Sequence, residues 1–564
     1  MLPSGCLDHA RLTIVAVCLF ISVVQGVLIS EPDRQTHMYG RDFIVALPPD
    51  AWQLEAAGSF LQIACVSGGL DPRANGSITL IGKGYSETFT ASPNASVGLK
   101  GFKPFLQSTN TTVLDTTSDS AVLAITSDSD IIVTLILQIG LTLSAYTAMP
   151  VRSLDKTYLV ASYGLLEDNL SELTVVATSP DLTSVQFISN ADNATRSINL
   201  LRNQSYVYKT SNDFVGGHLL CSVPYMAVVG SRCSDEASGC SGHSMNNLYP
   251  LVSLGMRYTA VAVESSDVSG TFRAVAVWNN TTISWSAGGL SDSGIVTLAN
   301  GQTKDINFRV REAGTIIGSK PFLLLHHVER GIPASDIALV TVPPHEQLTR
   351  KTITFSTYHQ PPSKSFITII NPCYDDIQLQ HISLSRPRTV STNSQSPTVV
   401  QLSDDEAVCG SSRELEPGVY TIGVSPDNVD SSHHGYSAIL YTITETGVAA
   451  HILATELNQV VCSVNQSEEV TLCQPKLVTV STTVTAKSTT SSKTFVTTPG
   501  GQKKNSAGGT IIAVVIVVLS LLAGAAVIGI LMFRYCRGRR WKRLEEADYM
   551  EDNPIRLQVL EQSL

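Results

Sequence analysis

Four segments with a shared pattern recur along the chain and decide its fold class. They read Gly40-Arg-Asp-Phe-Ile-Val-Ala46, Asp155-Lys-Thr-Tyr-Leu-Val-Ala161, Gly255-Met-Arg-Tyr-Thr-Ala-Val261 and Arg350-Lys-Thr-Ile-Thr-Phe-Ser356. After each comes a polar turn and a second run, at Phe60-Leu-Gln-Ile-Ala64, Glu172-Leu-Thr-Val-Val-Ala177, Thr271-Phe-Arg-Ala-Val-Ala276 and Ser365-Phe-Ile-Thr-Ile-Ile370. Runs of β-branched and aromatic residues between turn-forming residues are typical of β-strands.

A third run follows in three of the four cases, at Ser77-Ile-Thr-Leu-Ile81, Ser184-Val-Gln-Phe-Ile188 and Thr281-Thr-Ile-Ser-Trp285. The units start about 100 residues apart, and no segment here shows a helical period beyond two turns. Repetition on this scale predicts an all-β ectodomain of repeated antiparallel β units, arranged as a propeller-like ring or as tandem sandwiches. The alternative is that unrelated β-hairpins resemble one another to this degree.

Two apolar segments lie outside these units. The first, Leu12–Val24, follows Arg11 and is too short to span a membrane, so it is typical of a cleaved signal peptide covering residues 1–26. An uncleaved anchor is the alternative. The second, Ile511–Phe533, has 23 residues without a charge, which is long enough to cross a bilayer as one transmembrane α-helix.

Basic residues set the orientation of this predicted span. Six of them follow it directly, at Arg534, Arg537, Arg539, Arg540, Lys542 and Arg543. Basic residues next to a span remain cytoplasmic. The sequence therefore predicts a single-pass type I protein of the plasma membrane, with its N-terminus extracellular. A buried core helix is the alternative for the second apolar segment.

The cysteines agree with an extracellular location. Of 11 cysteines, those between the two apolar segments are Cys65, Cys221, Cys233, Cys240, Cys373, Cys409, Cys462 and Cys473. An even number in an oxidising compartment predicts disulfides and leaves their connectivity open. Local spacing favours pairs between Cys233 and Cys240 and between Cys462 and Cys473. Zinc binding is disfavoured by the compartment and by the absence of a CxxC pair.

Sequons for N-glycosylation lie in the same region. They begin at Asn75, Asn94, Asn110, Asn169, Asn193, Asn203, Asn279, Asn280 and Asn465. Glycans require surface loops, so these residues are expected in exposed loops and turns. The sequons at Asn279 and Asn280 overlap, and we expect only one of the two to carry a glycan.

The stretch before the second apolar segment has a different composition. Between Val478 and Thr498, 13 of 21 residues are serine or threonine, which is too little apolar surface for a core. Such a stretch is typical of an O-glycosylated, mucin-like stalk, with a bare flexible linker as the alternative. The predicted domains are a signal peptide (1–26), a β-rich extracellular domain (27–473), the stalk (474–510), the transmembrane helix (511–533) and a cytoplasmic tail (534–564).

The middle of the chain resembles a known family. The motifs are Pro224-Tyr-Met-Ala-Val-Val-Gly-Ser-Arg-Cys233, Cys240-Ser-Gly-His243, Leu248-Tyr-Pro-Leu-Val-Ser-Leu-Gly255, Phe272-Arg-Ala-Val-Ala276, Asn279-Asn-Thr-Thr-Ile283 and Asp336-Ile-Ala-Leu-Val-Thr-Val-Pro-Pro-His-Glu-Gln347. In order and spacing they resemble the N-terminal domain of the IgGFc-binding protein family, over approximately residues 38–460. The resemblance implies an extracellular module that contacts glycoproteins or mucus components.

The chain also departs from this family. The founding protein continues into cysteine-rich von Willebrand type D domains, whereas this chain has too few cysteines for them and ends in the predicted stalk and span. No motif marks an Fc site, so Fc binding is not carried across from the resemblance. The residues that bind a ligand are not identified by the sequence.

Motifs for catalysis, metals or cofactors are lacking. Ser241 and His243 lie close but without a Gly-x-Ser-x-Gly elbow. The pairs His326-His327 and His433-His434 are adjacent, and neighbours on a strand point to opposite faces. The acidic stretches 127–130 and 403–406 offer oxygen ligands for Ca²⁺, although solvated loops are favoured. We therefore expect no enzyme activity, catalytic residue, bound metal or cofactor.

The net charge and the C-terminal segment limit the classes of partner that the chain can have. The net charge of −10, from 38 basic and 48 acidic residues, argues against nucleic acid. Cys536, beside the predicted span, is a candidate for palmitoylation. Small residues four apart in the span, Ser520 with Gly524 and Ala525 with Gly529, favour a weak homodimer through the transmembrane helix.

The sequence leaves two candidate functions. The first is a cell-surface glycoprotein that acts as a binding or adhesion receptor for an extracellular glycoprotein or mucin ligand. The alternative is a structural component of the glycocalyx or mucus layer, tethered or shed.

Overall fold

The computed structural model describes residues within the first of two compact units, Met1–Val478. The described residues are 37–47, 60–66, 73–81, 84–91, 96–98, 115–118, 122–139, 142–163, 169–189, 194–233, 243–287, 293–310, 312–330, 336–357, 363–373, 377–382, 388–390, 398–403, 406–425, 435–445, 447–464 and 470–472. The predicted signal peptide, stalk, transmembrane helix and cytoplasmic tail, including Cys536, lie outside them. No helix long and apolar enough to cross a membrane occurs within these ranges.

Strands make up most of the described chain, and their pairing is antiparallel throughout the four repeats. Between them lie 3-10 turns at η3 (Val151–Ser153), η5 (Leu251–Ser253) and η6 (His345–Gln347). The expectation of an all-β fold built of antiparallel units is confirmed for these residues.

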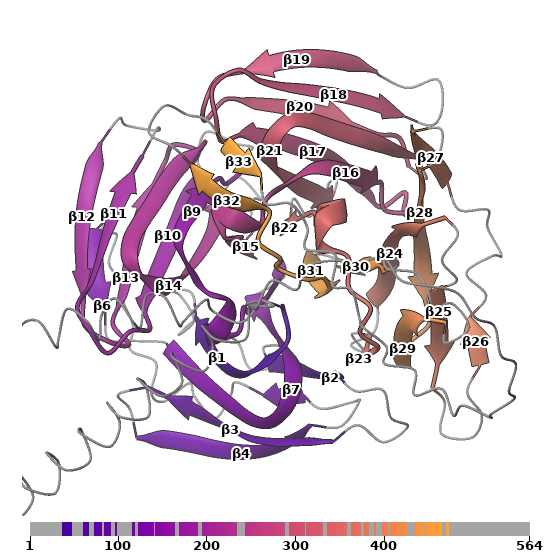
Figure 1. Ribbon diagram of the computed structural model, residues 1–564. Coiled ribbons are helices and arrows are strands. Elements are labelled where there is room, and N and C mark those ends of the chain that lie inside the picture. Colours follow the sequence, from indigo (N-terminus) through magenta and orange to yellow (C-terminus); the bar gives the residue numbers. More distant parts are fainter. Residues whose placement is uncertain are drawn as a thin grey trace, which may run out of the picture. The chain divides into compact units, whose positions relative to one another are not determined.

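The strands fall into four successive repeats, shown from indigo to orange in Figure 1. Repeat 1 contains β1 (Gly40–Ala46), β2 (Phe60–Val66), β3 (Ala74–Leu80), β4 (Tyr85–Ala91), β5 (Ser96–Gly98), β7 (Val122–Ile139) and β8 (Thr142–Thr147). Repeat 2 contains β9 (Asp155–Val160), β10 (Asn169–Ala177), β11 (Thr183–Ile188), β12 (Thr195–Leu200), β13 (Ser205–Thr210), β14 (Gly217–Cys233) and β15 (His243–Asn247).

Repeat 3 contains β16 (Gly255–Val261), β17 (Val268–Ala276), β18 (Thr281–Ala287), β19 (Gly294–Leu298), β20 (Thr303–Asn307), β21 (Ala313–Arg330) and β22 (Ile337–Thr341). Repeat 4 contains β23 (Ile353–Ser356), β24 (Ser363–Pro372), β25 (Ile377–His381), β26 (Arg388–Val390), β27 (Thr398–Ser403), β28 (Glu406–Leu415), β29 (Val419–Val424), β30 (Ser437–Thr444) and β31 (Val448–Ala454). A separate hairpin, β32 (Val461–Val464) with β33 (Val470–Leu472), follows.

One long bent strand organises each of the first three repeats. In repeat 3 the first half of β21 pairs with β16 and β18, and its second half pairs with β17 and β22. The partner of β16 jumps from Ile317 to Phe322 at the bend, and Pro321 lies in the skipped segment. In repeat 2 the jump on β14 runs from Leu220 to Tyr225. Proline within a sheet is confined to edges and bulges, which explains why Pro321 lies at the bend of β21 and Pro224 at the bend of β14.

Repeat 4 divides the role of the long strand between two shorter ones. Strand β29 pairs with β23 and β25, whereas β30 pairs with β24 and β31. Strand β6 (Asp115–Ser118), from the connection between β5 and β7, joins another repeat altogether and pairs with β13 of repeat 2. The chain therefore adds a strand from one repeat to the free edge of the next.

The innermost strands of the four repeats meet in a closed cycle. Strand β8 contacts β15 and β31, and β22 contacts the same two strands. Figure 1 shows β15, β22 and β31 near the centre of the four repeats. One hydrophobic cluster takes members from all of them, including Tyr146, Met245, Val340 and Ile452. This cyclic contact corresponds to the propeller-like arrangement of the two that the sequence left open, and we call residues 37–458 the ring.

The two ends of the ring are held together by hydrogen bonds. His37 contacts Glu456 through its Nδ1 atom, and the two residues also form a β-bridge. Ser153 donates a hydrogen bond from Oγ to the carbonyl oxygen of His37, at 2.7 Å. Thr349 donates one from Oγ1 to Glu456, at 2.6 Å. The segment before β1 therefore closes the ring against the segment after β31.

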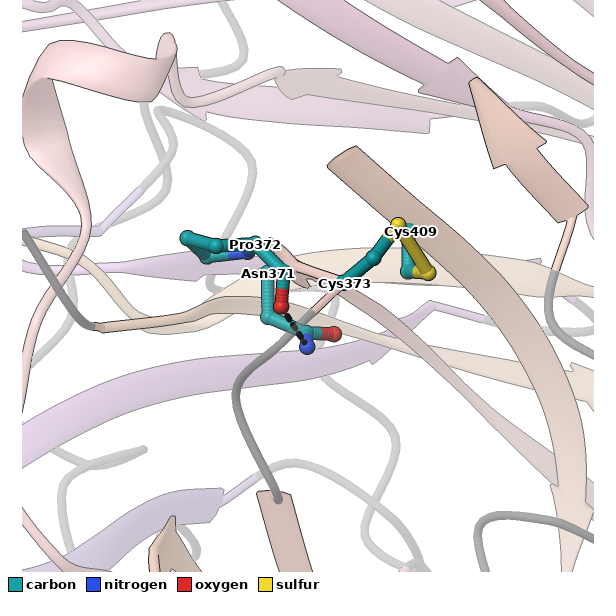
Figure 2. Close-up of a disulfide and its surroundings, with 4 residues drawn as sticks. All are labelled: Asn371, Pro372, Cys373 and Cys409. Atoms are coloured by element: carbon teal, nitrogen blue, oxygen red, sulfur yellow. Dashed lines mark hydrogen bonds between the residues drawn. A yellow bond between two sulfur atoms is a disulfide. The ribbon is translucent and has the colours of Figure 1, made fainter. Parts of the chain in front are cut away.

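A disulfide joins Cys373 and Cys409 in repeat 4 (Figure 2). Cys373 follows β24 directly, and Cys409 lies in β28, opposite Asn371 of β24. The structure thus confirms a disulfide between two of the expected cysteines, in a pairing that the sequence left open. The side chains of Cys233, Cys240, Cys462, Cys473 and Cys65 lie outside the described part of the chain. The predicted pairs between Cys233 and Cys240 and between Cys462 and Cys473 therefore stay predictions.

The expectation that all eight cysteines between the two apolar segments are paired does not hold for Cys221, which is a free thiol on β14. Its side chain packs at the edge of the hydrophobic cluster of repeat 2. A free cysteine in such surroundings acts as a small apolar side chain, and this packing accounts for its position.

We expect replacement of Cys409 by alanine to destabilise the chain. The disulfide closes a loop between residues 36 apart, and opening such a loop restores entropy to the unfolded chain, which costs about 2–4 kcal/mol. Urea unfolding of the oxidised protein and of the Cys409→Ala variant measures the difference. Replacement of Cys221 by alanine is the control, because it removes a thiol and no cross-link. Equal midpoints for the two variants would contradict the prediction.

Candidate functional site

The first family-like motif forms the centre of the ring. Pro224 lies at the bend of β14, and Tyr225 after it is fully buried. The hydroxyl of Tyr158 donates to the carbonyl oxygen of Tyr225, at 2.9 Å. In the motif Leu248–Gly255, Ser253 of η5 donates from Oγ to the carbonyl oxygen of Leu457, at 3.2 Å. The first of these bonds stabilises repeat 2, and the second ties the segment before repeat 3 to the segment after repeat 4.

The last of the quoted motifs, Asp336 to Gln347, links repeats 1, 3 and 4. The Oδ2 atom of buried Asp336 accepts hydrogen bonds from the backbone N–H groups of Leu143, at 3.1 Å, and Val448, at 2.7 Å. Its carboxylate therefore ties the starts of β8 and β31 to β22. Gln347 donates from Nε2 to the carbonyl oxygens of Ser253 and Asn458, each at 2.8 Å.

The two residues before Gln347 are also engaged in packing. His345 contacts the Oγ1 atom of Thr259 through Nε2, at 2.8 Å. Burial, followed by the nearby charge of Arg257, lowers the pKa of His345 to about 3. Burial also raises the pKa of Glu346, whose carboxylate accepts from the backbone N–H of Met256 at 3.4 Å. The motifs that carry the family resemblance thus hold the repeats together.

Within the described part of the chain, the cavity at the centre of the ring is too small for a ligand. A cavity of about 10 Å³ lies between the inner strands, with Thr147, Asn246, Asn247 and His451 among its lining residues. The amide of Asn246 donates to Oγ1 of Thr341 at 2.9 Å, and that of Asn247 donates to the carbonyl oxygen of Thr147 at 3.2 Å. A space of this volume holds about one water molecule. A ligand must therefore bind elsewhere.

A charged network joins repeats 2 and 3. Arg273 donates to both carboxylate oxygens of Asp305, at 2.8 and 3.0 Å, and to Asp213 of repeat 2, at 3.0 Å. Its guanidinium lies 3.9 Å from the ring centroid of Tyr163. No pattern in the sequence had predicted this network. The feature that could have indicated it is an arginine within the apolar run Thr271–Ala276, because a charged side chain in a buried strand needs partners of opposite charge.

The backbones of the same two repeats approach closely at a pair of glycines. Gly216 has a φ of +66°, and a Cβ atom added to it would lie 2.1 Å from the Cα atom of Gly301. Only a residue without a side chain fits this contact. The junction between repeats 2 and 3 is thus closed by packing as well as by charge.

An open groove of about 450 Å³ lies in repeat 3. It is lined by Ala262, Val263, Val268, Ser269, Gly270, Thr271, Asn307, Phe308, Arg309, Val310, His326 and Val328. Its floor is apolar, and the side chain of Val310 at its rim is 49% exposed. A groove of this size with a few polar groups has the character of a binding site.

The histidine pair His326-His327 of β21 has one member in this groove. The ring of His326 stacks on Phe272 at 4.0 Å between centroids, whereas His327 stacks on Tyr163 at 4.0 Å. Nδ1 of His326 contacts the hydroxyl of Tyr441 at 2.8 Å, and Nε2 has no hydrogen-bond partner. Burial is the main cause that lowers the pKa of each histidine to about 3, and both are therefore neutral at physiological pH.

The acidic stretch 127–130 forms the bend of β7. Asp128 accepts hydrogen bonds from the backbone and side-chain amides of Asn75, at 2.9 and 3.1 Å, and these bonds lower its pKa. Asp130 lies 3.4 Å from Arg41 and 3.8 Å from Arg152. These carboxylates thus have partners within the protein. The side chains of Ser241, His243, His433, His434 and residues 403–406 lie outside the described part.

The described sequons place their asparagines at the surface or in turns. Asn75 is exposed on β3, and Asn203 and Asn280 occupy turns with φ values of +68° and +57°. Asparagine tolerates this left-handed conformation better than most residues. The side chains of Asn94, Asn110, Asn169, Asn193 and Asn465 lie outside the described part.

At the overlapping sequons we expect the glycan on Asn280 rather than on Asn279. Asn280 is exposed, whereas Oδ1 of Asn279 accepts a hydrogen bond from the backbone N–H of Asn300, at 3.0 Å. The threonine of the Asn279 sequon, Thr281, is fully buried and donates to the carbonyl oxygen of Trp278. A glycan on Asn279 would disrupt these contacts.

Replacement of each asparagine by glutamine tests this assignment, because each variant leaves the other sequon intact. Asn280→Gln should lose one glycan in the folded, secretory-pathway protein, measured as the mass difference before and after glycosidase treatment. Asn279→Gln is the matched control and should retain it. Loss of the glycan from Asn279→Gln alone would reverse the assignment.

Comparison with known proteins bears on the same region. The family described as IgGFc binding protein matches residues 144–417, which run from β8 to just beyond β28. The family resemblance is thereby confirmed, over a shorter range than the approximate 38–460 expected from the motifs. None of the curated proteins compared with the chain matches it.

Proposed function

From the match of residues 144–417 to the IgGFc binding protein family, we propose that this chain is a cell-surface binding protein. Its β ring would contact an extracellular glycoprotein or mucus component. The family match is the observation that carries this proposal. The disulfide of repeat 4 and the exposed sequon asparagines support an extracellular location.

The proposal includes a type I anchor in the plasma membrane and a non-enzymatic role. The anchor rests on the apolar segment 511–533 and on the basic residues after it. The non-enzymatic role rests on the partners of the polar groups in the family motifs, because Asp336, His345 and Gln347 are engaged in contacts between strands. The more specific part of the proposal is that the chain acts as a receptor or in cell adhesion.

Binding to intact cells tests the function. Cells that express the full chain are incubated with labelled purified mucin, with labelled IgG Fc and with labelled serum albumin as the control. We expect saturable binding of a glycoprotein above the albumin level. Cells that express the chain without residues 37–472 provide the matched control for the stalk. Equal binding of all three proteins, or binding unchanged by this deletion, would contradict the proposal.

Antibody access tests the topology independently. An epitope inserted after residue 27 should stain on unpermeabilised cells, whereas one at the C-terminus should stain only after permeabilisation. The reverse pattern, or staining of neither without permeabilisation, would contradict the proposed orientation.

A further inference from the structure

We propose that the groove of repeat 3 binds an extended acidic peptide segment of a partner protein, which adds to β17 as a strand. This inference rests on the proposed binding function and assigns it a place on the ring. The occupant is inferred from three properties: an incomplete strand edge, an apolar floor, and two arginines, one at the rim of the groove and one beside its floor, that have no ion-pair partner among the described residues.

The edge of β17 is only partly covered. On one side, β17 pairs with β21 along its whole length, from Val268 to Ala276. On the other side, β20 pairs with it only from Val275 to Thr271. Among the described strands, none continues this pairing past Thr271 toward Val268. The N-terminal end of β17 is thus a short open edge, where an extended peptide can form main-chain hydrogen bonds.

In two other repeats the molecule adds a strand at a different edge, the outer edge of the strand equivalent to β20. In repeat 2, β6 lies beside β13, the counterpart of β20. In repeat 4, β27 lies beside β28. In repeat 3, the described strands end with β20 on this side of the sheet. Strand addition is therefore a form of association that this fold already uses.

The floor of the groove consists of opposed residues on one face of the β17–β21 pair. Gly270 lies opposite Val328, and Val268 lies opposite Arg330. Phe308 and Val310 come from the segment after β20, and Val310 is half exposed. Alternate side chains of an added strand point toward this face, so an apolar side chain of the peptide would pack between Val310 and Val328.

A buried polar atom faces the same space. The Nε2 atom of His326 has no hydrogen-bond partner, although the side chain is fully buried. A Cβ atom at Gly270 would lie 2.5 Å from it, so Gly270 packs directly against this atom and a larger residue would displace the ring. Buried polar groups are nearly always hydrogen-bonded, and an unpartnered one points to a missing ligand group. A backbone or side-chain polar group of the peptide would supply that partner.

The charges around the groove favour an acidic occupant. Arg309 is exposed at the rim, and Arg330 lies on the floor side opposite Val268. Neither guanidinium has an ion-pair partner among the described residues. Nearby Asp267, in contrast, is paired with Lys364 at 3.2 Å. Arginine binds carboxylates through charge-assisted, often bidentate hydrogen bonds.

Peptide selection tests this inference. The full-length chain, purified in detergent, is used to select from a displayed library of random ten-residue peptides. We expect enriched sequences with alternating apolar residues and at least one aspartate or glutamate. A synthetic peptide of the enriched sequence, and its version with amides in place of the acids, are then titrated by fluorescence polarisation. Hydrogen exchange with the peptide bound should slow at the amides of Val268–Gly270.

Two variants and a matched control locate the site. Arg309→Glu and Val310→Glu should each weaken the peptide by about tenfold or more, because the first repels the acidic residue and the second places a charge on the apolar floor. Ile295→Glu, at a 71% exposed position of β19 in the same repeat, should leave the affinity unchanged. Far-ultraviolet circular dichroism of each variant confirms folding.

Absence of enriched peptides, equal binding to Val310→Glu and the parent, or unchanged exchange at Val268–Gly270 would overturn the inference. Its failure is distinguishable from that of the proposed function. If cells with Val310→Glu still bind mucin or Fc as the parent does, the ring binds its glycoprotein through another surface. If the parent binds neither protein, the proposed function fails first.

Discussion

Acidification from about pH 7 to about pH 5 is expected to lower the free energy of unfolding of the ring by about 6 kcal/mol through buried histidines. His326, His327 and His451 are 0–3% exposed. Burial is the largest cause that lowers their pKa values, to about 3, 3 and 4. In the unfolded chain each titrates near its ordinary pKa of 6.5.

The sign follows from proton binding. Below pH 6.5 the unfolded chain takes up protons at these histidines and the folded ring does not, so stability falls as the pH falls. The contribution is complete above the unfolded pKa, and the loss continues down to the folded pKa values of about 3–4. At about pH 5 each histidine contributes a loss of about 2 kcal/mol, against a typical total of about 5–15 kcal/mol.

Urea unfolding at a series of pH values measures this loss. These three histidines should contribute about three protons to the slope of the free energy of unfolding against pH below the unfolded pKa, in addition to the protons taken up at His37 and His345, whose pKa values burial also lowers. The variant His451→Gln should reduce the slope by about one proton, whatever its effect on stability at neutral pH. A free energy that stays constant between neutral pH and about pH 5 would show that these histidines are protonated in the folded ring.

Replacement of Arg273 by alanine is expected to cost about 3–5 kcal/mol, because it leaves two carboxylates without their shared cation. Asp305 and Asp213 both accept hydrogen bonds from this guanidinium, at 2.8–3.0 Å. Arg273 is 12% exposed, and Asp213 and Asp305 are 24% and 38% exposed, so water replaces only part of the lost interaction. The stacking on Tyr163 is lost as well. Repeats 2 and 3 should then separate at lower urea concentrations than the rest of the ring.

Thermal and urea unfolding of Arg273→Ala, compared with Arg309→Ala, tests this expectation. Arg309 is an exposed arginine of the same repeat, and its replacement should change stability by less than about 0.5 kcal/mol. Arg273→Lys should recover part of the loss, because lysine retains the charge without the fork geometry. Similar destabilisation by Arg273→Ala and Arg309→Ala would mean that the network contributes little.

Local pattern was sufficient to predict the strands. The four quoted segments contain or overlap β1, β9, β16 and β23, because alternating β-branched residues next to turn formers read directly as strands. The closure of the repeats into a ring was not predictable in the same way. It depends on contacts between distant residues, such as Asp336 with Leu143 and Val448, whose partners leave no periodic signal.

The family motifs could be recognised in the sequence, but their structural role could not be predicted from it. Pro224, Asp336 and Gln347 belong to ordered motifs, and only the structure shows that they hold strands together. The groove escaped detection because its features are single residues: a glycine over a histidine, and a valine that stays exposed. The odd cysteine, Cys221, shows that an even count does not require every thiol to be paired.

The junction between His37 and Glu456 has a consequence for biosynthesis. The two residues lie 419 positions apart, so the first leaves the ribosome long before the second exists. During that interval, β8 and the segment before β1 are without the partners that β31 and its neighbours supply. Unpaired strands of this kind associate with other chains, and slow non-local pairing prolongs the danger. Newly made molecules are therefore expected to associate with one another most readily before translation has passed the fourth repeat.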